Sequence, residues 1–226
     1  HTCAILDDGS VSCWGRGLSG AIGNNQTIDF TTPTQTNNFG LGQSAVAISA
    51  GGEHTCVILA DGTVSCWGEG GLGQLGRGNS SNTFIPAPTS SLGAGRTAVA
   101  ISAGGVHTCV ILDDGSVSCW GHNSDGQLGN GGSPDYGRPT PTSSLGTGRT
   151  AVAISAGAEH TCAILDDGTT SCWGRADSGQ LGYGGTSEQN RPTPTSSLGV
   201  GRTAVAISSL SAHTCAILDN GFVSCW

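Results

Sequence analysis

Ten cysteines occur in five pairs, and the two residues of each pair are ten positions apart. A turn sequence lies at the midpoint of each pair, such as Asp7-Asp8-Gly9 between Cys3 and Cys13. If this turn is a three-residue loop with a left-handed glycine, the numbers of two residues that lie opposite each other in this hairpin sum to 16. Cys3 then lies opposite Cys13, and the two thiols face each other. A two-residue turn would place them on opposite faces of the hairpin. The spacing therefore predicts five disulfides: Cys3–Cys13, Cys56–Cys66, Cys109–Cys119, Cys162–Cys172 and Cys215–Cys225.

Two alternative interpretations of these cysteines are reduced buried thiols and a metal site built from His-x-Cys and the distant cysteine. Zinc sites usually contain Cys-x2-Cys pairs, a spacing that this chain lacks, so we predict no metal. Disulfides persist only in an oxidising compartment. We therefore expect a protein that is extracellular or exposed on a cell surface.

Several other chemically capable residues recur in every repeat, which favours structural roles. A histidine precedes each first Thr-Cys pair, and we interpret it as a hydrogen-bonding element rather than a base or ligand. The Asp pairs could bind calcium weakly, but aspartate is also what such turns require. The tryptophan after each second cysteine could form a ligand-binding array, and we expect it to pack between repeats. The recurring histidines are His1, His54, His107, His160 and His213.

One histidine, His122, stands outside the repeat pattern, in a loop where other units have Arg16, Glu69 and Arg175. We interpret it as exposed loop variation. A catalytic site should appear as a deviation from the repeat, and no nucleophile–base pair or metal cluster stands out. The sequence therefore predicts no enzyme and no cofactor, with a hydrolase or lyase on a propeller face as a third alternative.

The elements that position these residues repeat with a period of 53 residues. We take 1–226 as one repeat domain with units 1–53, 54–106, 107–159 and 160–212 and a partial fifth unit, 213–226. In each unit the sequence predicts a hairpin around the Asp/Gly turn and a strand at Ala45–Ser49 and its equivalents. An extended Pro-Thr-Pro segment is expected between them. Short strands in such a unit must stack on neighbouring units, and the period favours an all-β propeller with four-stranded blades over a linear solenoid.

Composition excludes several classes of protein. The chain carries a net charge of -8, which disfavours nucleic acid as a partner. No apolar stretch approaches the roughly 18 residues of a membrane-spanning helix, so we expect no membrane insertion. Glycine is abundant, with 39 of 226 residues, but has no three-residue period, which excludes collagen. The chain starts inside a repeat without an initiator Met, and we expect it to be processed or truncated.

The combined pattern of His-Thr-Cys-Ala-Ile-Leu-Asp-Asp-Gly, Ser-Cys-Trp-Gly, Gly-Gln-Leu-Gly and Ala-Val-Ala-Ile-Ser resembles the regulator of chromosome condensation (RCC1) repeat family. The resemblance covers every unit and implies a β-propeller, commonly of seven blades. The paired cysteines resemble the bacterial, exported branch of that family. Seven such units would need about 370 residues, so three arrangements remain open: a segment of a longer propeller, a smaller ring, or an open array continued by other molecules.

The functions implied by the resemblance differ between branches of the family. A nuclear member is an exchange factor on chromatin, but the acidity and the cysteines of this chain argue against that role. A light-sensing plant member contains Gly-Trp-Arg-His-Thr where this chain has Gly52-Glu53-His54-Thr55, so the sensing residues are absent. Secreted β-lactamase-inhibitor propellers imply that this fold can bind proteins outside the cell.

The most variable segments are polar and follow each Gly-Gln-Leu-Gly motif, at Asn24–Asn38, Arg77–Ala87, Asn130–Arg138 and Tyr183–Arg191. Two glycosylation sequons in these segments make Asn25 and Asn79 candidate glycan sites. We predict a non-enzymatic extracellular structural or adhesive scaffold that self-associates, with head-to-tail filaments as one form of it. The alternative is a secreted propeller that binds a specific protein or glycan through the variable loops.

Overall fold

The computed structural model describes residues 1–226 and contains eighteen β-strands and no helix. It therefore has no helix with the length and apolar character needed to cross a membrane. The strands are β1 (Thr2–Ile5), β2 (Val11–Gly15), β3 (Phe30–Gln35), β4 (Ala45–Ala50), β5 (His54–Leu59), β6 (Val64–Gly68), β7 (Thr83–Pro88), β8 (Ala98–Ala103), β9 (His107–Leu112), β10 (Val117–Gly121), β11 (Tyr136–Pro141), β12 (Ala151–Ala156), β13 (His160–Leu165), β14 (Thr170–Gly174), β15 (Gln189–Pro194), β16 (Ala204–Leu210), β17 (His213–Leu218) and β18 (Val223–Cys225).

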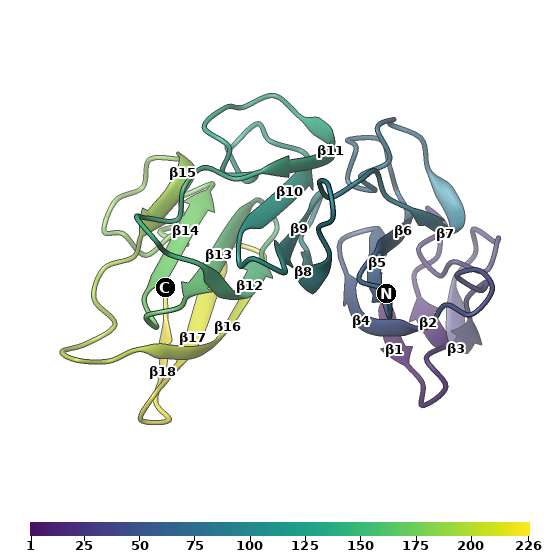
Figure 1. Cartoon of the computed structure of the whole chain (residues 1–226), viewed down its shortest axis with the longest axis horizontal. Coiled ribbons are helices and arrows are strands. Elements are labelled where there is room, and N and C mark those ends of the chain that lie inside the picture. The colour runs from purple at the N-terminus through teal and green to yellow at the C-terminus, as the bar shows by residue number, and fades with distance from the viewer.

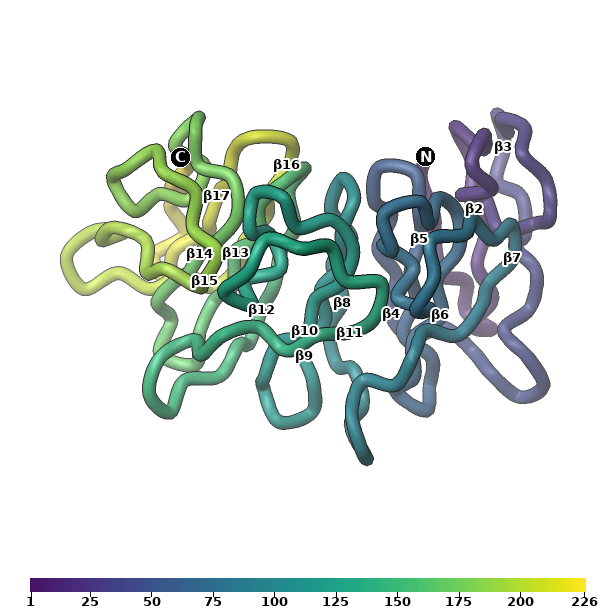
Figure 2. Tube along the Cα trace, turned by 90° about the horizontal axis from the view of Figure 1, so that it is seen from above, coloured from purple at the N-terminus to yellow at the C-terminus, as the bar shows by residue number.

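These strands form five antiparallel sheets that follow one another along an arc (Figure 1). Three sheets have four strands, β4–β7, β8–β11 and β12–β15, and the first and last have three, β1–β3 and β16–β18. The strands β4, β8, β12 and β16 contact one another in succession along the inside of the arc. Seen from above, the first and last sheets lie at opposite ends, and the sheets do not close into a ring (Figure 2). The predicted all-β propeller architecture with four-stranded blades is confirmed.

Each four-stranded sheet crosses a boundary of the 53-residue sequence unit. Its inner strand comes from the end of one unit and its other three strands come from the next, as when β4 pairs with β5. Successive units are therefore joined by a full ladder of backbone hydrogen bonds. The Pro-Thr-Pro segment is extended as expected and forms the outer strand, where the missing N–H groups of proline cost no ladder bond.

The Asp/Gly turn has the predicted three-residue geometry. The N–H of Leu6 donates to the Ser10 carbonyl at 2.8 Å, and the N–H of Gly9 donates to the Leu6 carbonyl at 2.9 Å. Gly9 has a φ of 77°, which favours glycine, and the resulting register opposes Cys3 to Cys13. All five predicted disulfides are present, with Cα–Cα distances of 4.1 Å, and no free cysteine remains.

The core lies between neighbouring sheets. Trp120 is fully buried against the Cys56–Cys66 disulfide and Leu75 of the preceding sheet, and its Nε1 donates to the Gln74 carbonyl at 2.9 Å. The backbone of Gly76 packs directly against this indole, since a Cβ atom at this position would come within 2.8 Å of Trp120 Nε1. The same packing recurs at Trp67 and Trp173. The predicted role of the tryptophans between repeats is confirmed for these three.

Candidate functional site

The recurring histidines form part of the junction between sheets. The Nε2 atom of His54 lies 2.9 Å from Thr108 Oγ1, and that hydroxyl donates to the Gln74 carbonyl at 2.9 Å. Because the threonine proton is used on the carbonyl, His54 must donate through Nε2–H. The same His–Thr contact joins His1 to Thr55 at 2.8 Å, His107 to Thr161 at 2.8 Å and His160 to Thr214 at 2.8 Å.

Burial governs the ionisation of the three interior histidines. It lowers the pKa of His54 and of His160 to about 4 and that of His107 to about 3, because a charged imidazole would lose its hydration. Their Nδ1 atoms are buried without a hydrogen-bond partner. A base that is enclosed and contacts only the next sheet cannot reach a substrate, so these histidines hold the sheets together.

A cavity of about 220 Å³ lies along the inside of the arc. Small residues from the ends of the inner strands line it, such as Ala50-Gly51-Gly52 and Ala103-Gly104-Gly105. No titratable side chain belongs to its wall. The cavity can therefore accommodate a ligand only by shape, by contact with backbone groups and through the Ser211 hydroxyl.

Charged side chains gather in the loops that follow β2, β6, β10 and β14. In the first unit Arg16 pairs with Glu53 at 2.9 Å, and the Ser19 hydroxyl donates to the same carboxylate at 2.6 Å. In the fourth, Arg175 bridges Glu159 and Asp177 beside a cavity of about 200 Å³. Hydrogen bonds from Arg175 hold the pKa of Asp177 below its usual value. Arg16 and Glu53 thus neutralise each other, whereas Arg175 is shared by two carboxylates.

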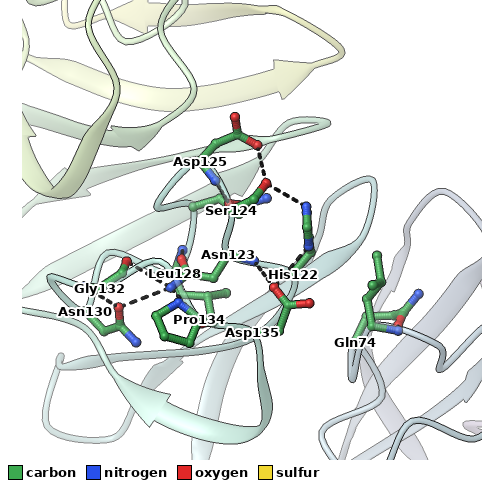
Figure 3. A network of polar contacts seen from close by, with 12 residues as sticks. Gln74, His122, Asn123, Ser124, Asp125, Leu128, Asn130, Gly132, Pro134 and Asp135 are labelled. Atoms are coloured by element: carbon green, nitrogen blue, oxygen red, sulfur yellow. Dashed lines mark hydrogen bonds and ion pairs between the residues drawn. The ribbon is translucent and has the colours of Figure 1, made fainter.

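The third unit has a different arrangement in the same loop (Figure 3). His122 lies between Ser124 and Asp135, with one ring nitrogen in contact with each, and its side chain is only 23% exposed. The interpretation of His122 as exposed loop variation missed this network. The signal available in the sequence was Ser124, two positions after the histidine and in the one unit that contains it.

The Asp pairs of the hairpin turns have the expected turn chemistry. Asp114 Oδ1 accepts from the backbone N–H of Ser116 at 3.0 Å, and Arg96 pairs with both Asp113 and Asp114. Hydrogen bonds from Ser116 hold the pKa of Asp114 below its usual value. The structure contains no group of three or more His, Cys, Asp or Glu side chains that could hold a metal ion.

The first five residues of each variable segment form an exposed loop, and the rest of the segment includes part or all of the outer strand. We call these loops the outer loops: residues 24–28, 77–81, 130–134 and 183–187. Each of the first three contacts the outer strand of the next sheet through one backbone bond, such as Asn25 N–H to Phe84 O at 2.9 Å. Ile28, which is 58% exposed, and Phe84, which is 40% exposed, add apolar surface beside these loops. The sequon residues Asn25 and Asn79 are both exposed.

Comparison with known proteins matches this geometry. The model of the regulator of chromosome condensation (RCC1) repeat matches residues 8–58, 61–111, 114–164 and 167–217. The ultraviolet-B receptor UVR8 of Arabidopsis thaliana is 35% identical over 200 residues, which are 88% of this chain and 45% of that protein. The E3 ubiquitin-protein ligase HERC2 of Homo sapiens is 30% identical over 227 residues, 100% of this chain and 5% of HERC2.

Among solved structures, Prp20p of Saccharomyces cerevisiae, described with its binding properties to Gsp1p and histones, superposes with a TM-score of 0.83 at 23% identity. The match covers 99% of this chain and 55% of Prp20p. The chain thus spans less than half of the length of each of the two curated relatives and about half of the length of Prp20p. With repeats matched along nearly its whole length and propeller sheets in succession, the chain belongs to the RCC1 repeat family.

Proposed function

We propose that this chain acts outside the cell as a scaffold whose outer loops bind a protein partner. One observation carries the proposal: the outer loops differ between units in sequence, yet each has five residues and projects from the same place on a repeated frame. Exposed loops that vary on a rigid scaffold are where binding specificity resides. The exposed Ile28 and Phe84 supply the apolar contact that protein interfaces require.

The extracellular location rests on the cysteines. Every cysteine is paired, and each bridge closes a short hairpin in a chain with 39 glycines. Such bridges are stable in oxidising compartments and are reduced in the cytosol. The net charge of -8 makes a protein a more suitable partner than nucleic acid. Intact mass before and after reduction, with alkylation of the native protein, tests the location: alkylated cysteines in protein from its natural source would argue against it.

The equal lengths of the outer loops allow a matched binding test. Beads coated with the chain are applied to intact cells of the source organism, and adhesion is compared with that of a variant in which 24–28 and 77–81 carry the sequence of 183–187. We expect the exchange to abolish adhesion while the sheets stay folded. Equal adhesion of both proteins would reject binding through these loops. Protease treatment of the cells distinguishes a protein partner from a glycan.

A second candidate is an adhesive scaffold that assembles head to tail. The observation that favours it is the repetition of one junction: the His–Thr contact is made four times with distances of 2.8, 2.9, 2.8 and 2.8 Å. A surface that repeats in this way can be continued by another copy, and contacts of that kind produce filaments when they do not close. Sedimentation over a hundredfold range of concentration tests it, and a constant monomer mass would reject it.

We also propose that Asn25 and Asn79 carry glycan when the chain is made in a host with N-glycosylation. Both side chains are exposed in outer loops and fit the Asn-x-Ser/Thr sequence. An amidase that removes N-glycans should then lower the mass of the protein from such a host. No change in mass would reject the assignment.

A further inference from the structure

The loop after β10 differs from its equivalents at three consecutive positions. It contains His122, Asn123 and Ser124, whereas the other units have Arg16-Gly17-Leu18, Glu69-Gly70-Gly71 and Arg175-Ala176-Asp177. Positions that serve the repeated frame have the same residue type in each unit. These three positions vary among all four units and so lie outside the repeated frame, and only the third unit places a histidine and a serine there together.

The three side chains of this loop form a continuous relay with the residue before β11 (Figure 3). Ser124 Oγ lies 2.8 Å from His122 Nε2, and His122 Nδ1 lies 3.0 Å from Asp135 Oδ1. Hydroxyl, imidazole and carboxylate thus occur in series, with a different ring nitrogen at each contact. This is the connectivity by which a histidine removes a proton from a serine while a carboxylate fixes its tautomer.

The backbone around the relay is held in place by Asn123, which is completely buried. Its Nδ2 donates to the carbonyls of Gly132 and Pro134, both at 3.0 Å, and its Oδ1 accepts from Leu128 N–H at 3.0 Å. The N–H of Asn123 donates to Asp135 Oδ1 at 2.8 Å, the same oxygen that contacts His122. The carboxylate is therefore fixed before it orients the imidazole.

Two unused hydrogen-bond donors lie beside Ser124. Its own backbone N–H donates to no protein group, and Gln127 Nε2 is buried without a partner. In the fourth unit the equivalent amide, Gln180 Nε2, donates to Asp177 at 3.4 Å, and Asp177 occupies the position of Ser124. The Gln127 amide therefore lies on the side of the loop that carries Ser124. Because the Gln127 amide is buried, the backbone N–H of the exposed Ser124 is the donor that can stabilise the oxyanion formed during acyl transfer.

A competing acceptor moderates the relay. Asp125 Oδ2 lies 3.0 Å from Ser124 Oγ, and a hydroxyl has a single proton to donate. When Ser124 donates to Asp125, His122 Nε2 receives no proton from it. Removing this carboxylate should therefore favour the arrangement in which His122 acts as the base.

We propose that Ser124 is an activated nucleophile for small carboxylic esters, with His122 as its base and Asp135 as the residue that positions His122. Ser124 Oγ bonds to the ester carbonyl carbon, its proton passes to His122 Nε2, and the ester C–O bond breaks as the leaving alcohol takes that proton. Water then cleaves the acyl-serine bond, releases the acid and restores the hydroxyl. The exposed position of Ser124 suits small acyl groups. This inference goes beyond the proposed binding function and concerns one loop.

Labelling with a biotinylated fluorophosphonate tests the proposal on the intact chain. The reagent forms an Oγ–P bond and releases fluoride, and peptide mapping locates the modified serine. Ser19 and Ser178 lie in the equivalent loops without a histidine and serve as controls in the same molecule. We expect Ser124 to react at least tenfold faster than either. Equal labelling of the three serines would overturn the proposal.

Variants separate chemistry from structure. Asp135→Asn is a matched change, because Asn82 holds the equivalent place in unit two and accepts from Gly70 N–H at 3.0 Å. His122→Ala and Asp135→Asn should each lower Ser124 labelling and p-nitrophenyl acetate hydrolysis at least tenfold, whereas Asp125→Ala should raise both. Unchanged rates in His122→Ala would overturn the proposal. Adhesion of the coated beads should be the same in all three variants, so failure here leaves the binding proposal intact.

Discussion

The junctions between sheets and the outer loops obey opposite rules within the same 53-residue unit. At a junction, a histidine, a threonine and a tryptophan recur with nearly the same contacts each time, because each must fit the copy in the next unit. In the outer loops, five residues of different sequence occupy the same place in each unit, and each of the first three loops makes one backbone contact with the next sheet. Repetition is thus required where a unit meets another unit, and variation is tolerated where it meets solvent.

The largest expected effect is a loss of stability at the junctions between pH 6.5 and 4.5. The unfolded histidines have a pKa near 6.5, whereas burial lowers the folded values to about 4 for His54 and His160 and about 3 for His107. The unfolded chain therefore binds more protons in this range. The stabilising contribution of the neutral histidines is fully present above pH 6.5. The free energy of unfolding falls as the pH decreases, by about 2 kcal/mol for each histidine at pH 5.

Urea denaturation at pH 7.5, 6, 5 and 4.5 measures this loss. The variant His107→Gln retains an Nε2–H donor for Thr161 but cannot titrate, so its free energy of unfolding should depend less on pH. Hydrogen bonds within the turns also lower the pKa values of Asp61, Asp114 and Asp167, and these carboxylates lose most of their stabilising contribution below the chosen range. A free energy of unfolding that is constant from pH 7.5 to 4.5 would contradict the structural role of these histidines.

The second expected effect concerns the tryptophans. Replacing Trp120, which is fully buried between two sheets, by alanine should lower the free energy of unfolding by about 3–5 kcal/mol. Trp14 occupies the equivalent position in the first sheet but is half-buried, so Trp14→Ala should cost less. Chemical denaturation of the two variants compares them, and equal losses would show that packing against the preceding sheet is not what stabilises Trp120.

Removing one disulfide should have the third largest effect. Cys109 and Cys119 close a hairpin loop with a sequence separation of 10, and the double substitution to serine should cost about 3 kcal/mol through greater freedom of the unfolded chain. The change removes no contact from the outer loops. Denaturation of this variant at pH 7.5 provides the measurement, and an unchanged midpoint would mean that the hairpin is already fixed by its register and turn.

The sequence predicted the repeated part of the molecule well because that part is local. The distance between Cys3 and Cys13 follows from turn geometry alone, and the role of Trp120 follows from its recurrence. The relay around His122 was missed because its partner Asp135 lies 13 positions away, across a loop without periodicity. Only the fold of that loop, held by the buried Asn123, brings these side chains together.

The smallest expected effect lies in the outer loops. Exchanging residues 24–28 for the sequence of 183–187 should change the free energy of unfolding by no more than about 0.5 kcal/mol, because these side chains are largely exposed. Asp29, which accepts from Gly17 N–H at 3.0 Å, lies outside the exchanged residues. The exchange leaves every junction unchanged. If it destabilised the chain as much as Trp120→Ala does, the outer loops would belong to the frame, and their variation would no longer favour a role in binding.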